Sequence, residues 1–191
     1  MPEIRPLIAL VPVGEPPRVI LEGLIPLIEQ RFPGRACRID DTGLAVSAKT
    51  YVASRKQFQA NPLLDALGRT SGDAERVLGV ADVDLFVPGL SFVFGLAQLS
   101  GRASLIALPR LQPEFSGDAP NPRLFLERAI KEAVHELGHT YGLEHCDDPL
   151  CVMHFSNSLA DTDYKSDRFG PEHLQELNQH LGLVPPRRFR A

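Results

Sequence analysis

The stretch "HELGHTYGLEH", from His135 to His145, constrains the fold of this chain more than any other feature. Apolar residues lead into it with the 3.6-residue period of one helix face: Leu126, Ile130, Ala133, Val134, Leu137 and Tyr141. Asn121 followed by Pro122 predicts the start of this helix, since asparagine caps helices and proline suits their first position. Gly142 predicts its end. The pattern therefore predicts one helix of about five turns.

Three histidines and a glutamate on this helix predict a metal site. His135 and His139 lie four residues apart, so both imidazoles leave the same helix face. Gly142 can adopt the left-handed conformation, which would turn the chain sharply and bring His145 back to the same point. Three nitrogens then leave a fourth tetrahedral position open to water, as in a catalytic zinc site. Glu136 points to that open side and would accept a proton from the water.

A plain explanation exists for each of these residues taken singly. A lone histidine in a helix is usually a surface residue or a core residue with satisfied hydrogen bonds. The joint occurrence of three histidines, one glutamate and one glycine at fixed offsets is much harder to explain by chance.

The length and charge of the chain limit the class of protein. A chain of 191 residues fits one domain, which we expect to have an upper lobe of about residues 1–142 and a lower lobe of about 143–191. The 20 basic and 24 acidic residues are mixed along the chain, and the net charge is -4. Because there is no basic stripe and no polybasic patch, we expect neither a nucleic-acid partner nor a membrane partner.

The N-terminal sequence and the cysteines indicate the compartment. "MPEIRPLIALVPVG" lacks the basic lead and unbroken apolar core of a signal peptide. The uncharged stretch Leu85–Gly101 is short for a membrane span and contains Pro88, so two buried strands explain it better. Three cysteines, an odd number, favour a reducing compartment and thus a cytoplasmic protein. We expect Cys37 to be a small buried residue.

Strands and helices are predicted to alternate before the long helix. The expected order is a strand at Leu7–Val13, a helix through Val19–Ile28, a strand at Ala36–Ile39 and a helical piece at Leu63–Leu67. Three strands in quick succession then follow at Asp82–Val87, Phe92–Ala97 and Ala103–Leu108. Their short connections favour antiparallel neighbours, with Phe92–Ala97 at the edge. The fold class is therefore α/β, with a mixed sheet.

The segment from His135 to Phe169 resembles a known family. "HELGHTYGLEH" matches the extended zinc-binding signature of the metzincin clan of metalloproteases. Cys146, Cys151 and Met153 after it, and "DYKSDRF" further along, resemble the archaemetzincin family of that clan. "LFVPGLSFVFGLA" upstream is similar to the family's edge-strand region. The resemblance covers most of the chain, although it is weak before residue 75.

This resemblance implies a metzincin-like fold, with a mixed twisted sheet, an active-site helix and a smaller C-terminal lobe. It implies a zinc metalloprotease that hydrolyses peptide bonds of peptides or proteins with a zinc-activated water. The ligands would be His135, His139 and His145, with Glu136 as general base and Met153 in a Met-turn under the metal. The edge strand that binds the substrate backbone would include Phe94, Gly95, Leu96 and Ala97.

The alternative is a zinc-binding or peptide-binding protein that keeps the metal and has lost hydrolysis. Retention of Glu136 argues against this alternative, because the three histidines can hold a metal without that carboxylate. The sequence does not distinguish an aminopeptidase from an endopeptidase.

The family resemblance also implies a second zinc, bound by four cysteines, and here this chain departs from the pattern. Gly170 and His173 stand where the last two cysteines would be. Cys146, Cys151 and His173 would still provide three ligands, with water or a carboxylate such as Asp147 as the fourth. The other interpretation is that the second site has lost its metal and that both cysteines are ordinary thiols.

Overall fold

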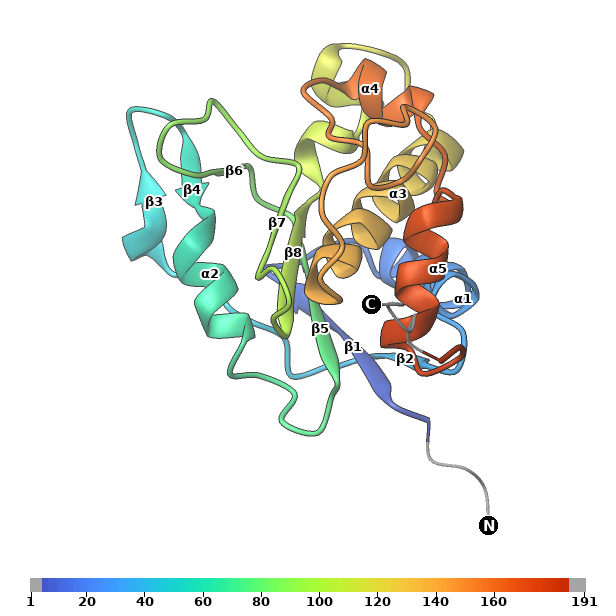
Figure 1. Cartoon of the computed structure of the whole chain (residues 1–191). Helices are drawn as coiled ribbons and strands as arrows, with labels where there is room; N and C mark the ends of the chain where they lie inside the picture. The colour runs from blue at the N-terminus through green and yellow to red at the C-terminus, as the bar shows by residue number, and fades with distance from the viewer. Residues whose placement is uncertain (1–4, 186–191) are drawn as a thin grey trace.

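The structure, a computed structural model, describes residues 5–185, and its centre is a five-stranded sheet (Figure 1). The strand order is β2-β1-β5-β8-β7. The strands are β1 (Leu7–Val13), β2 (Ala36–Ile39), β5 (Arg76–Ala81), β7 (Gly95–Ala97) and β8 (Ala103–Ala107). The first four in this order pair in parallel, and β7 pairs antiparallel with β8 at the edge. The predicted α/β fold with a mixed sheet is confirmed.

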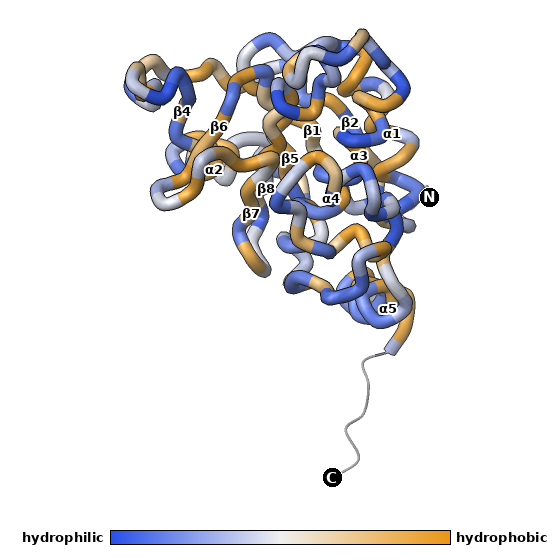
Figure 2. The backbone as a smooth tube through the Cα atoms, turned by 90° about the horizontal axis from the view of Figure 1, so that it is seen from above, coloured by the Kyte–Doolittle hydropathy of each residue, from blue (hydrophilic) through white to orange (hydrophobic). Residues whose placement is uncertain are grey.

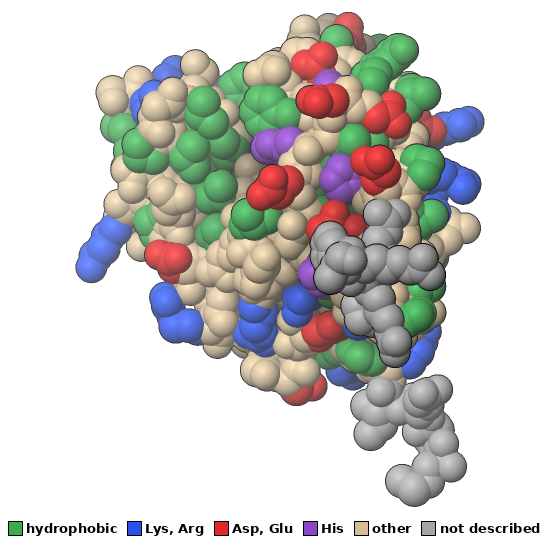
Figure 3. Space-filling model, in the orientation of Figure 1, with side chains coloured by type: hydrophobic (Ala, Val, Ile, Leu, Met, Phe, Trp, Pro, Cys, Tyr) green, Lys and Arg blue, Asp and Glu red, His purple; other side chains and the backbone are tan. Residues whose placement is uncertain are grey.

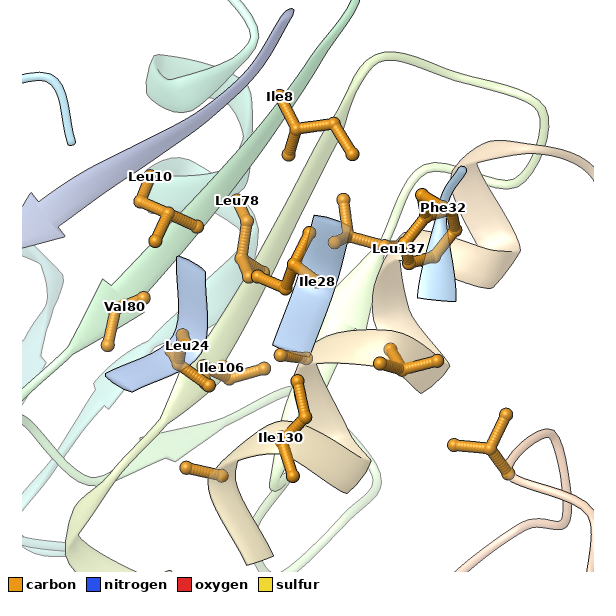
Figure 4. Packing of buried hydrophobic residues seen from close by; sticks show 14 of the residues in the cluster. Ile8, Leu10, Leu24, Ile28, Phe32, Leu78, Val80, Ile106, Ile130 and Leu137 are labelled. Atoms are coloured by element: carbon orange, nitrogen blue, oxygen red, sulfur yellow. The ribbon is translucent and has the colours of Figure 1, made fainter. Parts of the chain in front are cut away.

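Helices cover both faces of this sheet. They are α1 (Arg18–Arg31), α2 (Ala60–Leu67), α3 (Pro122–Thr140), α4 (Leu159–Tyr164) and α5 (Pro171–His180). In β1, Ile8 and Leu10 pack in the core beneath α1 and α3, whereas Ala9 and Val11 pack in the core beneath α2. Figure 4 shows the larger core, where side chains of the sheet meet those of α1 and α3. Seen from above, strands β1, β5 and β8 lie in the interior of the molecule (Figure 2).

A smaller sheet and three short 3-10 helices complete the described fold. The small sheet contains β3 (Tyr51–Val52), β4 (Gln57–Gln59) and β6 (Leu85–Phe86). The 3-10 helices are Ala48–Thr50, Pro109–Leu111 and Pro113–Ser116. Within residues 5–185, no helix combines the length and the apolar character that a membrane crossing requires.

Several predicted elements have the expected bounds. The strands at Leu7–Val13 and Ala36–Ile39 match β1 and β2, and the long helix begins at Pro122 after the Asn121 cap. Helix α2 starts earlier than expected, at Ala60, with Pro62 as its third residue. Proline is tolerated there because the first N–H groups of a helix have no intrahelical acceptor.

The strand predicted at Asp82–Val87 is confirmed only at Leu85–Phe86, which form β6, and it does not join the main sheet. The long strand is β5, just before this segment, and the chain leaves the main sheet after Ala81. Strand β6 pairs in parallel with β4 and meets the next predicted strand through an isolated antiparallel bridge between Leu85 and Val93. Gly79 weakens the strand pattern of β5, yet a Cβ there would lie 2.8 Å from a methyl carbon of Leu105. Close packing of Leu67 from α2 and Leu105 from β8 therefore requires the glycine.

The strand predicted at Phe92–Ala97 is shorter in the structure, where β7 spans Gly95–Ala97. Its edge position and its antiparallel pairing with β8 are confirmed. The hydrogen-bond ladder continues one residue further, because the Ala107 N–H donates to the Phe94 carbonyl at 2.8 Å.

Cys37 is 5% exposed in β2, as expected for a small core residue. Burial raises the pKa of its thiol to about 12, and the nearby Glu29 adds to the rise. Since the thiolate is the reactive form, we expect Cys37 to stay unmodified when the native, metal-free protein is treated with iodoacetamide at neutral pH. Cys146, which is half-buried, should be alkylated first. Peptide mapping by mass spectrometry checks this order, and early labelling of Cys37 would contradict it.

Candidate active site

Helix α3 is fixed at both ends by its own sequence. At its start, the side chain of Asn121 accepts a hydrogen bond from the Leu124 N–H at 3.0 Å. At its end, Gly142 adopts a φ of 90°, and its N–H donates to the His139 carbonyl at 2.9 Å. The Leu143 N–H donates to the Gly138 carbonyl at 3.2 Å, which completes a Schellman motif. The chain thereby reverses directly after the second histidine.

This reversal brings His135, His139 and His145 together. Their ligand nitrogens all lie within 4.8 Å of one another. The Nε2 atoms of His135 and His139 are 3.1 Å apart, and the rings of His139 and His145 have centroids 4.9 Å apart. The three imidazoles therefore face one common point, as the spacing predicts.

Backbone carbonyls orient two of these rings. Nδ1 of His135 lies 2.8 Å from the Val152 carbonyl, and Nδ1 of His139 lies 2.7 Å from the Leu143 carbonyl. A carbonyl accepts a hydrogen bond, so each Nδ1 carries the proton and each Nε2 keeps a free lone pair. This arrangement is the one that supports metal-binding histidines.

Burial keeps the imidazoles in their neutral form. It lowers the pKa of His135 well below the usual range, and it also lowers the pKa of His139 and of His145. The ammonium group of Lys165 adds to the lowering at all three. Neutral imidazole is the form that binds a metal.

Glu136 lies beside this cluster and is buried against strand β7. It is 6% exposed, and a Cβ added to Gly95 would lie 2.6 Å from its carboxyl carbon. Burial raises the pKa of this carboxyl well above its usual range, Glu132 adds to the rise, and Lys165 opposes it. The carboxyl group thus occupies a space that exists because residue 95 has no side chain.

A buried ion pair that the sequence analysis missed lies one helical turn from Glu136. Lys165 is 1% exposed, and its Nζ lies 3.1 Å from Oε1 of Glu132. Thr162 donates to the same oxygen at 3.1 Å, and Nζ also donates to the His154 carbonyl at 3.4 Å. The pair joins α3 to the segment that follows α4. The sequence could have indicated that Glu132 lies on the same helix face as Glu136, because the two are four residues apart. Nothing local in the sequence identifies Lys165 as the partner of Glu132.

Met153 packs directly beneath the histidine-bearing turns of α3. It is fully buried, and its sulfur would lie 2.5 Å from a Cβ added to Gly138. The Cys146 N–H donates to the Met153 carbonyl at 3.0 Å, which ties the methionine to the residue after His145. The glycine between the two helical histidines therefore makes room for this methionine.

Two cavities meet at His135, Glu136 and Gly95. The larger, of about 510 Å³, is lined by residues that include Leu96, Ala97, Leu99, His139, Glu144 and His145. The smaller, of about 260 Å³, is lined by residues that include Phe92, Phe94, Glu132, Phe155, Ser156 and Asn157. Phe155 is exposed, and the centroids of its ring and the His145 ring are 4.9 Å apart. Figure 3 shows histidine and acidic side chains beside a hydrophobic area on one face.

A second cluster brings together Cys146, Cys151 and His173, whose ligand atoms also lie within 4.8 Å of one another. Sγ of Cys151 lies 3.6 Å from Nδ1 of His173 and accepts a hydrogen bond from the Gly170 N–H at 3.1 Å. Burial raises the pKa of the Cys146 thiol, while the backbone N–H of Asp148 opposes the rise. Asp147 and Asp148 line the adjacent cavity, but neither belongs to the cluster.

Known proteins resemble this chain in sequence and in fold. Residues 30–179 match the model of the family described as "Peptidase family M54". An archaemetzincin from Pyrococcus furiosus is 44% identical over 184 residues, which cover 94% of this chain and 96% of that protein. An archaemetzincin from Thermococcus kodakarensis is 36% identical over 183 residues, with 93% and 98% covered.

The solved structures agree. The crystal structure of archaemetzincin from Methanopyrus kandleri superposes with a TM-score of 0.83 at 34% identity, covering 93% of this chain and 96% of that one. A zinc-dependent peptidase from Methanocorpusculum labreanum superposes with a TM-score of 0.80 at 26% identity, covering 90% and 100%. By its family match, its relatives and its fold, the chain belongs to peptidase family M54, the archaemetzincins.

Proposed function

We propose that this chain hydrolyses peptide bonds in peptide or protein substrates, with one zinc ion held by His135, His139 and His145. The main support is the geometry of the three histidines. Their ligand nitrogens lie within 4.8 Å of one another, and Nδ1 of His135 and of His139 hydrogen-bonds to a backbone carbonyl. Neutral imidazoles with supported orientations suit zinc. Membership of a peptidase family supports the hydrolytic reading over a protein that only binds zinc or peptides.

Zinc bound there would supply Lewis acidity, which polarises the substrate carbonyl and makes a water easier to deprotonate at neutral pH. Glu136 is the general base in this proposal. Its carboxylate takes a proton from the attacking water and then donates that proton to the nitrogen of the departing amine. Its position in the lining of both cavities supports this role.

The free edge of β7 is the proposed site for the substrate backbone. Gly95, Leu96 and Ala97 form this edge, Phe94 extends its ladder, and Gly95 lies against Glu136. An extended peptide can add to such an edge through main-chain hydrogen bonds, so recognition would depend only partly on side chains. The substrate would then run between an upper lobe of about residues 1–142 and a lower lobe of about 143–191.

Met153 is proposed to support the metal site from below, as the residue of the Met-turn. Its burial beneath Gly138 and its backbone link to Cys146 support this role. Its packing would hold the helix turn that carries His139 and the segment that carries His145 in a fixed relation.

A second zinc is proposed on Cys146, Cys151 and His173. The convergence of their ligand atoms and the hydrogen bond from Gly170 to Cys151 support this site. Because two thiols so close together would pair under oxidising conditions, the proposal also favours a reducing compartment, such as the cytoplasm.

Replacing His145 with alanine is expected to lower zinc occupancy of the catalytic site sharply, because two imidazoles form a weak site. Metal analysis after dialysis checks this result, with His180→Ala as the control, since His180 is exposed on α5 and belongs to neither ligand cluster. Normal zinc content in the His145→Ala protein at the catalytic position would exclude His145 as a ligand.

Incubation of the zinc-loaded protein with a mixed peptide library, with cleavage products identified by mass spectrometry, tests the function itself. We expect new internal or terminal cleavage sites that disappear when zinc is removed by a chelator and return when it is restored. A fully metallated protein that cleaves no peptide would support the non-hydrolytic alternative. The positions of the cuts distinguish an aminopeptidase from an endopeptidase.

A further inference from the structure

The second cluster lacks one ligand for a tetrahedral metal, and Gly170 marks the missing direction. Zinc in a closed structural site takes four protein ligands, whereas Cys146, Cys151 and His173 offer three. A Cβ built on Gly170 would lie 3.5 Å from Cys151 Sγ and 3.5 Å from Asp148 Oδ2. The carboxylate of Asp148 therefore stands beside the position from which a side chain at residue 170 would approach the metal.

A tight turn holds Asp148 next to Cys151. The Cys151 N–H donates to the Asp148 carbonyl at 3.1 Å, which closes a four-residue turn through Pro149. The Leu150 N–H donates to Asp148 Oδ1 at 3.0 Å, so one carboxylate oxygen is engaged in the turn. The other oxygen, Oδ2, is the one nearest to Gly170.

We propose that Asp148 supplies the fourth ligand of the second zinc through Oδ2, in place of the thiolate that Gly170 cannot provide. The inference rests on the proposed second site and assigns a ligand set of two thiolates, one imidazole and one carboxylate. Zinc accepts all three ligand types, with bonds to oxygen of roughly 2.0–2.2 Å. Asp148 is exposed and lies outside the 4.8 Å cluster, so Oδ2 must move toward the cysteines when the metal binds, while Oδ1 keeps its hydrogen bond from the Leu150 N–H.

Other carboxylates line the same cavity of about 580 Å³, namely those of Glu144, Asp147, Glu172 and Glu176. The three atoms nearest to a Cβ built on Gly170 are Oδ2 of Asp148 and two atoms of Cys151, so none of these four carboxylates is among them. Asp147 precedes Asp148 directly and carries the same charge. It is therefore a matched control for any effect of the field in this acidic region.

Cobalt(II) is a suitable probe because it shares zinc's preference for mixed nitrogen, oxygen and sulfur ligands. The full chain, first loaded with one equivalent of zinc, is titrated with cobalt(II) while sulfur-to-cobalt charge-transfer absorption is recorded. We expect wild type and Asp147→Ala to bind one further metal with a tetrahedral spectrum. Asp148→Ala should bind it at least roughly 10-fold to 100-fold more weakly, which is the loss caused even by removing a supporting group.

Rescue sharpens this test. Gly170→Cys in the Asp148→Ala background should restore tight binding, with more intense charge-transfer absorption from a third thiolate. The substitution fits, because the added Cβ meets nothing closer than 3.5 Å and Gly170 has a φ of -62°. This rescue would show that the Asp148→Ala protein is folded and lacks only a ligand.

Each outcome decides a different point. Equal cobalt affinity of Asp148→Ala and wild type would overturn the assignment of Asp148 while leaving the second site in place. Equal weakening by Asp147→Ala and Asp148→Ala would also overturn it, because general charge would then explain the effect. A wild-type protein that never binds a second metal in excess cobalt or zinc would exclude the site altogether, without affecting the catalytic zinc.

Discussion

Replacing Glu136 with glutamine is expected to leave the zinc content unchanged and to lower kcat for peptide hydrolysis by roughly 10²-fold to 10⁴-fold. Glutamine has nearly the same shape, so it fits the buried space against Gly95 that the glutamate occupies. It cannot accept the proton of the attacking water. The three imidazoles lose no contact with one another, because Glu136 is not part of their cluster.

Zinc analysis and single-turnover cleavage of one peptide from the library measure the two halves of this prediction. Glu127→Gln is the control, since Glu127 lies on the same helix and makes an exposed ion pair with Arg123 at 2.8 Å. This control should keep wild-type activity. Near wild-type kcat in Glu136→Gln would refute its role as general base, and loss of zinc from that variant would leave the fall in activity without a chemical interpretation.

The active-site helix could be predicted closely because its signals are local. The cap at Asn121, the apolar period and Gly142 lie within one stretch, so the positions of His135 and His139 on one face followed directly. The return of His145 also depended on one glycine turn. Short-range backbone geometry determines these features, and a single sequence reports it well.

The sheet could be predicted only in part, because strand pairing depends on distant residues. Strand β5 pairs with β1 and β8, and both of these partners are distant from it in the sequence. Gly79 lowers the β propensity of this strand. The glycine is present because Leu67 and Leu105 pack closely against it, which only the tertiary fold reveals. Strand β6 was assigned to the wrong sheet because its distant partner, β4, was not predicted as a strand.

The surroundings of Glu136 could not be predicted from the helix alone. Lys165 comes from a segment 33 residues after its partner Glu132, and Gly95 comes from the edge strand before the helix. Both contacts require the tertiary fold. They show that Glu136 lies between a buried ion pair and the edge of the sheet, and this arrangement has a direct consequence for Gly95.

Replacing Gly95 with alanine is expected to lower kcat by roughly 10²-fold while zinc content and KM change little, because a misplacement of about 1 Å can cost this much. The new Cβ would lie 2.6 Å from the carboxyl carbon of Glu136, well inside ordinary contact distance. The new Cβ would also lie 2.5 Å from Cγ of Glu136, so the whole side chain must move aside for the protein to fold. The catalytic base would then be displaced, with the metal site unaltered.

Steady-state kinetics with zinc analysis and thermal unfolding check this prediction. Gly72→Ala is the matched control, because it adds the same methyl group where no atom lies within 4 Å, and it should behave as wild type. In the double variant, Glu136→Gln should cost much less than it does alone, since two changes that disable one group are not additive. A large rise in KM with normal kcat would instead assign Gly95 to substrate binding along β7. Full additivity in the double variant would mean that Gly95 acts independently of the base.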